Sequence, residues 1–294
     1  MNPRVCLLGF GEVGQTLVAD LRARVGGLAA WDLKFADSTS SPALAAGRLE
    51  LLAAADPRAA VADADVVISA VTAAQIGEAA RSVAKHLKPQ AYFFDLNSTS
   101  PAAKQAAAAV IDSAGGRFVE ATVMSAIAPR RAASPMLLGG PHAVGFLPVA
   151  MKLGFTGAQV FSEKLGAASA AKMCRSVVIK GLEALMLESL LTARNFGVEQ
   201  AVLESLQSTF PAETLRTHGR YMISRALVHG RRRAEEMREV ARTVAEAGLV
   251  PRMSGACAEW QDWAAGHSAA AANEDLEQML DTLLATKQRG TAPC

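Results

Sequence analysis

A short apolar run near the N-terminus leads directly into a glycine-rich turn and then into a helical pattern. The run is Val5-Cys6-Leu7-Leu8, and the turn that follows it has the spacing G-x-G-x-x-G. A strand, such a turn and a helix in this order are typical of a dinucleotide-binding unit, in which the helix N-terminus attracts the phosphates. We therefore predict that the cofactor contacts are Gly9, Phe10, Gly11, Glu12, Val13 and Gly14. The alternative is a glycine-rich turn without a ligand.

Asp32 follows a second strand-like run and lies 18 residues after Gly14. Dinucleotide-binding units place an acidic residue about 20 residues further on, where its carboxylate accepts hydrogen bonds from the ribose diol. Because a carboxylate repels a 2′-phosphate, the sequence favours NAD over NADP as the cofactor. Lys34 stands two residues later and could pair with that phosphate, so NADP is not excluded. The other interpretation is that Asp32 caps a loop, since aspartate is a common turn residue.

The composition narrows the class of protein. A length of 294 residues suits two domains, and a hydrophobic content of 51% provides a large core. The net charge of +2 argues against a nucleic-acid partner. Cys6, Cys174, Cys257 and Cys294 show no C-x-x-C spacing, so they suit a reducing cytoplasm better than a zinc site or a disulfide framework. No basic and apolar signal precedes the first strand, so we do not expect export, and no apolar run reaches about 18 residues, so we do not expect a membrane span.

Strand-like and helix-like segments alternate through the first half of the chain, which predicts a parallel sheet flanked by helices. The predicted strands cover residues 4–9, 28–34, 66–70, 92–96, 118–123, 136–138 and 159–161. The predicted helices between them include residues 13–25, 40–50, 73–86 and 101–114.

The second half of the chain contains no convincing strand. A long helical stretch from Ala167 to Asn195 comes first. Shorter helices follow, separated by Gly197, Pro211, Gly230, Gly248 and Gly266. We therefore predict an α/β protein with a Rossmann-type doubly wound parallel sheet in residues 1–163 and an all-α domain in residues 164–294.

This arrangement resembles the β-hydroxyacid dehydrogenases, a group that includes the 3-hydroxyisobutyrate and 6-phosphogluconate dehydrogenases. The resemblance covers nearly the whole chain. It is carried by the glycine-rich turn, by Asp95-Leu96-Asn97-Ser98-Thr99-Ser100-Pro101, and by Gly166 and Lys172 at the start of the long helix. Residues 172–181 and 229–237 look like a divergent subgroup whose helical domain has no settled function. The resemblance implies an NAD(P)-dependent oxidoreductase, and a homodimer in which a partner covers the long apolar helix.

Lys172 is the predicted proton-transferring group, because it matches the catalytic lysine of the family. The cofactor carries the hydride, so the protein has one hydroxyl proton to manage. An amine accepts that proton only when it is neutral, which desolvation by Met173 and Val177 would favour. The alternative is a solvated surface lysine, the usual environment of this residue type.

Further cofactor and substrate contacts are predicted at the ends of the strands. Loops at the carboxyl ends of parallel strands line the ligand crevice. Val71, Thr72 and Asn97 are therefore predicted on the nicotinamide side, and by resemblance Ser98 faces the substrate. The alternative is that this second loop only caps the helix that begins at Pro101, through Thr99 or Ser100.

Three departures from the family pattern concern the substrate. Ser176 stands one turn after Lys172, where the family has asparagine, and it either binds the substrate hydroxyl or bonds back to a carbonyl. Ser125 stands where the family has a Ser-Gly-Gly element. Arg232 and Arg233 replace the usual Lys-Asp pair and would clamp a carboxylate, unless they pair with nearby glutamates at a solvated helix start.

These observations predict hydride transfer between a nicotinamide cofactor and a small hydroxy acid, most simply a β-hydroxy acid, without a metal. Two alternatives remain open. One is an imine or ketone reductase on the same scaffold. The other is a cofactor-binding regulatory protein without turnover, which the missing asparagine after Lys172 leaves possible.

Overall fold

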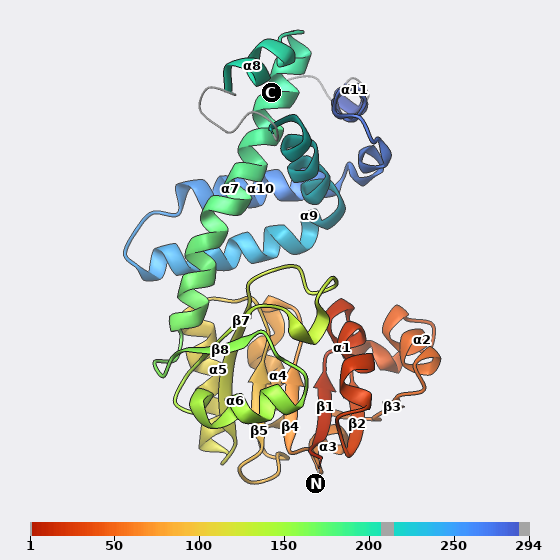
Figure 1. Ribbon diagram of the computed structural model, residues 1–294, viewed down its shortest axis with the longest axis vertical. Helices are drawn as coiled ribbons and strands as arrows, with labels where there is room; N and C mark the ends of the chain where they lie inside the picture. The colour runs from red at the N-terminus through yellow and green to blue at the C-terminus, as the bar shows by residue number, and fades with distance from the viewer. Residues whose placement is uncertain (1, 207–214, 288–294) are drawn as a thin grey trace. The chain divides into compact units, whose positions relative to one another are not determined.

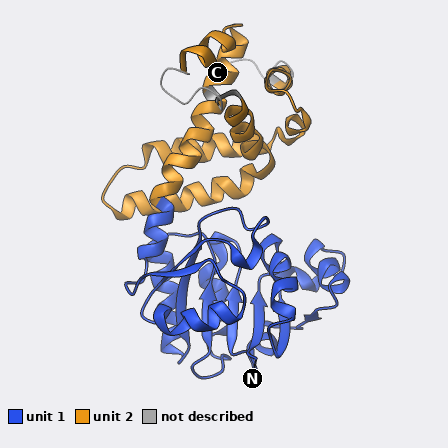
Figure 2. Cartoon of the chain, in the orientation of Figure 1, with its two compact units in different colours: residues 1–173 blue, residues 174–294 orange. Residues whose placement is uncertain are grey.

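The computed structural model describes residues 2–206 and 215–287, so Pro211 and Cys294 lie outside the described residues (Figure 1). The chain divides into two compact units, Met1–Met173 and Cys174–Cys294 (Figure 2). The division falls inside one long helix, α7 (Ala167–Asn195), so the first turns of α7 belong to the first unit. Within the described residues, no helix has both the length and the apolar character needed to cross a membrane.

An eight-stranded sheet forms the centre of the first unit, and helices flank it (Figure 1). The strands are β1 (Arg4–Leu8), β2 (Gly27–Trp31), β3 (Leu52–Ala53), β4 (Val66–Ser69), β5 (Tyr92–Asp95), β6 (Arg117–Val123), β7 (Met136–Gly139) and β8 (Ala158–Ser162). Their order across the sheet is β3-β2-β1-β4-β5-β6-β7-β8. The chain reverses its winding direction between β1 and β4, which is the place where open α/β sheets bind ligands beyond their carboxyl ends.

The predicted strands all form, and the inner strands of the sheet are covered on both faces. Val5 and Leu7 of β1 belong to one core cluster, whereas Cys6 and Leu8 belong to a second. Successive strand residues point to opposite faces. An uninterrupted apolar run is therefore what a sheet covered on both faces requires.

Two features of the sheet differ from the prediction. β3 is a two-residue exposed strand, too short to leave an apolar pattern in the sequence. β7 pairs antiparallel with β6, so the sheet is mostly rather than wholly parallel. The segment between β6 and β7 contains only the 3-10 turn Arg131–Ala133 and no α-helix. A parallel return usually needs a helical crossover, which explains the reversed direction.

Six α-helices flank the sheet. They are α1 (Glu12–Arg22), α2 (Ser41–Arg48), α3 (Pro57–Val61), α4 (Ile76–Ala84), α5 (Pro101–Ser113) and α6 (Ala143–Lys152). α5 starts where the sequence predicted: Pro101 occupies its first turn, and the Ser100 hydroxyl accepts a hydrogen bond from the Ala103 N–H at 3.3 Å. This cap fixes the end of the loop that carries Asn97 and Ser98.

The described part of the second unit is helical. It contains the rest of α7 and then α8 (Glu199–Leu206), α9 (Leu215–Glu246), α10 (Arg252–Ala265) and α11 (Leu276–Lys287). The prediction that Gly230 separates two helices is wrong, because Gly230 lies inside α9. A Cβ atom at this position would stand 2.4 Å from the Gln261 carbonyl oxygen of α10, so the glycine is needed for close helix packing.

Candidate functional site

The glycine-rich turn between β1 and α1 has the geometry of a phosphate cradle. Gly9 has φ +93°, and a Cβ atom there would lie 2.6 Å from the Ala70 carbonyl oxygen. A Cβ atom on Gly14 would lie 2.5 Å from the Gly9 carbonyl oxygen, so a side chain would push α1 off the turn. Gly11 differs from both, because a Cβ atom there would meet no atom within 4 Å. The space beside Gly11 is therefore open, at the N-terminus of α1, where the helix dipole favours an anion.

Asp32 lies directly after β2 and reaches back to this turn. Its Oδ2 accepts a hydrogen bond from the Phe10 N–H at 2.7 Å, and its Oδ1 accepts one from the Lys34 N–H at 2.9 Å. The second bond caps the following 3-10 turn, which agrees with the loop-capping interpretation. The first bond places a carboxylate against the glycine-rich turn, where the diol of a ribose would be expected. Asp32 therefore caps the 3-10 turn and also stands at the predicted cofactor position.

Val71 and Thr72 continue β4 beyond its carboxyl end. The Val71 Cγ1 atom would stand 2.9 Å from a Cβ atom on Gly9, so Val71 lies beside the glycine-rich turn. Thr72 is exposed and precedes the short 3-10 turn Ala73–Gln75. Val71 therefore borders the turn on the side of β4, and Thr72 follows it in the chain.

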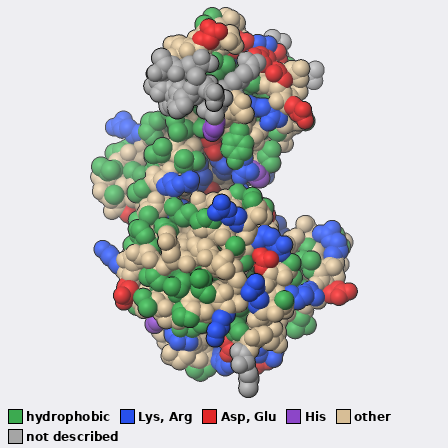
Figure 3. Space-filling view, viewed as in Figure 1, with side chains coloured by type: hydrophobic (Ala, Val, Ile, Leu, Met, Phe, Trp, Pro, Cys, Tyr) green, Lys and Arg blue, Asp and Glu red, His purple; other side chains and the backbone are tan. Residues whose placement is uncertain are grey.

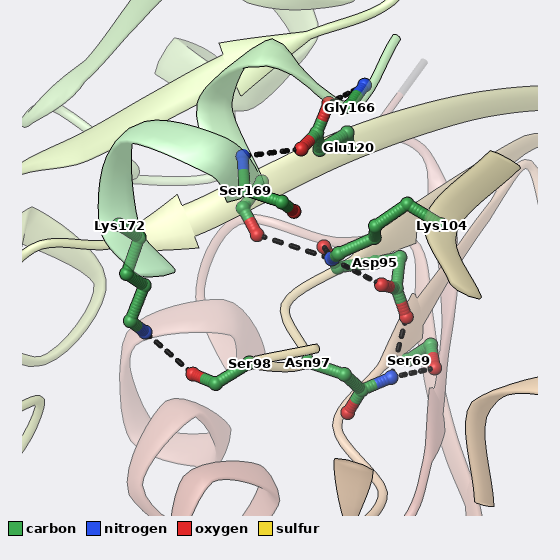
Figure 4. A network of polar contacts seen from close by, with 10 residues as sticks. Ser69, Asp95, Asn97, Ser98, Lys104, Glu120, Gly166, Ser169 and Lys172 are labelled. Carbon is green, nitrogen blue, oxygen red and sulfur yellow. Dashed lines mark hydrogen bonds and ion pairs between the residues drawn. The ribbon is translucent and has the colours of Figure 1, made fainter. Parts of the chain in front are cut away.

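Lys172 and Ser98 meet in the first unit, although 74 residues separate them (Figure 4). The Lys172 Nζ atom donates a hydrogen bond to the Ser98 Oγ atom at 2.5 Å. Lys172 comes from the second turn of α7, and Ser98 comes from the loop after β5. Both side chains are half-buried. This pair joins an amine and a hydroxyl at the carboxyl end of the sheet.

Glu120 of β6 fixes the start of the helix that carries Lys172. Its carboxylate is fully buried and accepts hydrogen bonds from the Gly166 N–H at 2.7 Å and the Ser169 N–H at 2.6 Å (Figure 4). The first N–H groups of a helix have no partner within the helix, so this carboxylate satisfies two of them and opposes the helix dipole. The position of Lys172, three residues after Ser169, is thereby tied to the sheet.

A buried ion pair lies beneath the loop that carries Asn97 and Ser98. Asp95, at the end of β5, pairs with Lys104 of α5, and both side chains are fully buried. The Lys104 Nζ atom also donates to the Asp95 carbonyl oxygen at 3.1 Å. Burial raises the pKa of the Asp95 carboxyl, and the Lys104 ammonium and the donors on Ser69 and Asn97 oppose that rise. A pair of this kind is costly to break, because removal of one partner leaves a buried charge alone.

Asn97 joins this pair to the candidate site. Its Nδ2 atom donates to the Ser69 Oγ atom at 2.8 Å and also to the Asp95 Oδ1 atom. Its Oδ1 atom is buried and has no hydrogen-bond partner among the described residues. A buried carbonyl oxygen without a donor is costly unless a ligand or water supplies one.

The remaining predicted substrate residues have these surroundings in their own units. Ser125 is exposed in the loop after β6, where its hydroxyl donates to the Ala126 carbonyl oxygen at 3.0 Å. Ser176 is buried on α7, in the second unit. The Arg232 Nη1 atom donates to the Glu236 Oε1 atom at 2.8 Å, and Arg233 forms a buried ion pair with Glu183. Both arginines lie in the middle of α9, so the expected solvated helix start is wrong.

Sequence reasoning missed Lys104, Glu120 and Lys180, although the first two left a signal. Lys104 stands at i, i+3, i+4 and i+7 spacing with Ala107, Ala108 and Ile111, which are the core-facing positions of α5. Glu120 is a charged residue that stands between the apolar residues Val119 and Ala121 inside a strand. Lys180 pairs with Glu236, and burial lowers the pKa of its ammonium. A charge at a position that periodicity assigns to the core indicates a buried partner.

Comparisons with known proteins match sequence in both units of the chain. The sequence pattern of the NAD binding domain of 6-phosphogluconate dehydrogenase matches residues 4–154, and that of a domain of unknown function, DUF1932, matches residues 193–264. A conserved hypothetical protein from Sinorhizobium meliloti is 37% identical over 96% of both chains, with a TM-score of 0.74.

Two further solved structures share the fold. A conserved protein of unknown function, described as similar to 3-hydroxyacid dehydrogenases, is 30% identical over 92% of this chain and 100% of its own, with a TM-score of 0.68. The 3-hydroxyisobutyrate dehydrogenase of Mycobacterium tuberculosis, solved with L-serine, is 19% identical over 96% of this chain and 99% of its own. Its TM-score is 0.70, a likeness that shows the fold alone.

Proposed function

The chain belongs to the family of the NAD-binding domain of 6-phosphogluconate dehydrogenase, and we propose that it transfers a hydride between a nicotinamide cofactor and a small hydroxy acid. Membership confirms the predicted resemblance, the cofactor class and the class of NAD(P)-dependent dehydrogenase or reductase. The residues present fit such a cofactor. The space beside Gly11 admits a pyrophosphate, and the buried Asn97 Oδ1 atom offers an acceptor that the described residues leave unused.

The contact between Lys172 and Ser98 carries the proposal, with Lys172 as the general acid and base. The bound nicotinamide would supply the hydride chemistry. In alcohol oxidation the neutral Lys172 amine takes the hydroxyl proton of the substrate, and in reduction the ammonium returns it. Ser98 Oγ restrains the flexible four-carbon stem of the lysine, so that the Nζ atom is held where a substrate hydroxyl would bind.

The substrate is proposed to be a small hydroxy acid, most simply a β-hydroxy acid. Ser98 would contact it from the same loop as Asn97, and Ser125 would contact it from the loop after β6. The second unit, which contains Ser176, Arg232 and Arg233, we assign to substrate binding and dimerisation. Steady-state reduction of NAD and NADP by a panel of β- and α-hydroxy acids tests this proposal. Turnover with a β-hydroxy acid supports it, and tight cofactor binding without turnover on any acid would favour a regulatory protein.

NAD is expected to bind at least about tenfold more tightly than NADP, because like charges placed together cost several kcal/mol. The Asp32 carboxylate lies against the glycine-rich turn and would face the 2′-phosphate of NADP. Isothermal titration with both cofactors measures the ratio, and Lys34→Met serves as the control, because it should leave the ratio unchanged. Tighter binding of NADP, together with its loss in Lys34→Met, would show that Lys34 and not Asp32 governs the ribose site.

The chain is expected to form a homodimer through α7. Val178, Leu185 and Phe196 are apolar and are 60%, 51% and 73% exposed. Leu185 and Phe196 also line a groove of about 420 Å³ with Val198 and Val202. Apolar side chains reach the surface of both units in Figure 3. A groove lined by apolar side chains of α7, of α8 and of the connection between them is more than the scattered exposure of single apolar residues.

Sedimentation velocity tests the dimer. The unmodified chain should sediment at twice the monomer mass, and Leu185→Glu combined with Phe196→Glu should sediment as a monomer. Leu249→Glu is the matched control, since Leu249 is 65% exposed outside this groove. A monomeric unmodified chain would overturn the proposal.

The cysteines Cys6, Cys174 and Cys257 are unpaired, and we place the protein in a reducing cytoplasm on that basis.

A further inference from the structure

The amide of Asn97 can present only one of its two polar atoms to a ligand. Its Nδ2 atom faces the Ser69 Oγ atom and the Asp95 carboxylate, and its Oδ1 atom points away from both (Figure 4). An ionised carboxylate accepts hydrogen bonds and donates none. The amide therefore turns its NH₂ group toward Asp95, which leaves its carbonyl oxygen for the ligand.

The orientation of this amide depends on the charge of Asp95, and that charge depends on Lys104. Asp95 is fully buried, an environment that favours a neutral carboxyl. The Lys104 ammonium, also fully buried, lies against the carboxylate and against the Asp95 and Ala121 carbonyl oxygens at 3.1 and 3.4 Å. A neutral carboxylic acid could donate to the Asn97 Oδ1 atom and let the amide turn over. The ammonium prevents this by holding Asp95 in its acceptor-only state.

We propose that the buried Lys104–Asp95 pair is a positioning device that fixes the Asn97 carbonyl oxygen as an acceptor for the carboxamide NH₂ of the nicotinamide ring. The inference rests on the proposed function and adds to it a preference among pyridine nucleotides. The site would favour a pyridine nucleotide whose ring substituent donates a hydrogen bond over one whose substituent cannot. Lys104 and Asp95 act through Asn97 and do not themselves touch the cofactor.

The ring substituent can be tested by binding alone. The acetylpyridine analogue of NAD replaces the carboxamide NH₂ by a methyl group and keeps the carbonyl, the ribose units and the pyrophosphate. The wild-type protein should bind NAD at least about fivefold more tightly than this analogue, the cost of leaving one buried acceptor unpaired. Isothermal titration of the full chain gives both dissociation constants without any need for a substrate.

Two variants test whether Asn97 and the Lys104–Asp95 pair cause this ratio of dissociation constants. Asn97→Ala should bind NAD and the analogue almost equally, because the acceptor is gone. The pair variant, Lys104→Met with Asp95→Asn, removes both charges together, and an amide at position 95 both donates and accepts. On a logarithmic scale, the ratio of dissociation constants in this variant should lie at least halfway from the wild-type ratio to the ratio of Asn97→Ala. The control is Lys88→Met with Asp65→Asn, an exposed pair at 2.5 Å in the same unit, which should keep the wild-type ratio.

Each outcome decides a different claim. A wild-type ratio near one, with NAD bound, overturns the inference but leaves the proposed function intact. A ratio that survives in Asn97→Ala overturns it as well, because another group then reads the carboxamide. A ratio lost in Asn97→Ala but kept in the pair variant overturns the positioning role of Lys104. If the pair variant fails to fold, Ser69→Ala tests the same role, because it leaves Asp95 as the remaining acceptor for the Asn97 NH₂ group. It should keep the wild-type ratio, and loss of the ratio would overturn the positioning role of the pair. Absence of any NAD binding instead contradicts the proposed function.

Discussion

Lys172→Met lowers kcat by roughly 100-fold or more, the range assigned to a positioned general acid–base group. Methionine keeps the length and the apolar stem of the side chain, so packing on α7 survives while the proton-transferring atom is lost. Cofactor affinity should be nearly unchanged. The rate of alcohol oxidation by the wild type should rise with pH, because only the neutral amine accepts a proton, and this rise should be absent in the variant.

Lys152→Met is the matched control, since Lys152 is exposed at the end of α6 and should leave kcat unchanged. Ser98→Ala should give a smaller loss than Lys172→Met, because the amine remains and only its restraint is removed. Wild-type kcat and an unaltered pH profile in Lys172→Met would remove Lys172 from the mechanism.

Gly11→Val abolishes NAD binding and leaves the fold intact. A Cβ atom at Gly11 meets no atom within 4 Å, and the φ of −79° suits any residue, so the protein itself tolerates the side chain. The valine would instead fill the space through which a pyrophosphate approaches the backbone. The change in the free energy of unfolding should stay within about 1 kcal/mol, and titration with NAD should show no heat of binding.

Gly47→Val is the matched control for this substitution. Gly47 lies in α2 of the same unit and also has open space around its missing side chain. It should therefore bind NAD with the wild-type affinity. Gly9→Val would not serve, because the valine would collide with the Ala70 carbonyl oxygen and disturb the fold itself. Undiminished NAD affinity in folded Gly11→Val would place the cofactor elsewhere.

The inner strands of the sheet were predictable because they are covered on both faces. Runs such as Val66–Ser69 and Tyr92–Asp95 have no polar residue to interrupt them until the strand ends. The reversed direction of β7 was missed because strand propensity does not encode direction. The absence of a helix between β6 and β7 was the available signal. Gly230 was misread as a helix end, because a glycine that permits helix packing looks the same in the sequence as a glycine that ends a helix.

The candidate site was only partly predictable, for a related reason. Lys172 and Ser98 were found through motifs, but their contact depends on the position of α7, which a carboxylate on β6 determines. The pairs Lys104–Asp95 and Arg233–Glu183 join residues that lie far apart in sequence or on different elements. Pattern reasoning can flag a charge at a core-facing position. It cannot name the partner, because the partner is set by tertiary packing.

A crystal structure of the chain with NADH bound tests the central claim most directly. We expect the pyrophosphate beside Gly11 and the nicotinamide ring beyond the carboxyl ends of β4 and β5. The ring carbon that exchanges the hydride should face the Lys172–Ser98 pair, with room for one small substrate between them. A pyrophosphate beside Gly11 with the nicotinamide ring turned away from Lys172 would contradict the assignment of Lys172 as the proton-transferring group.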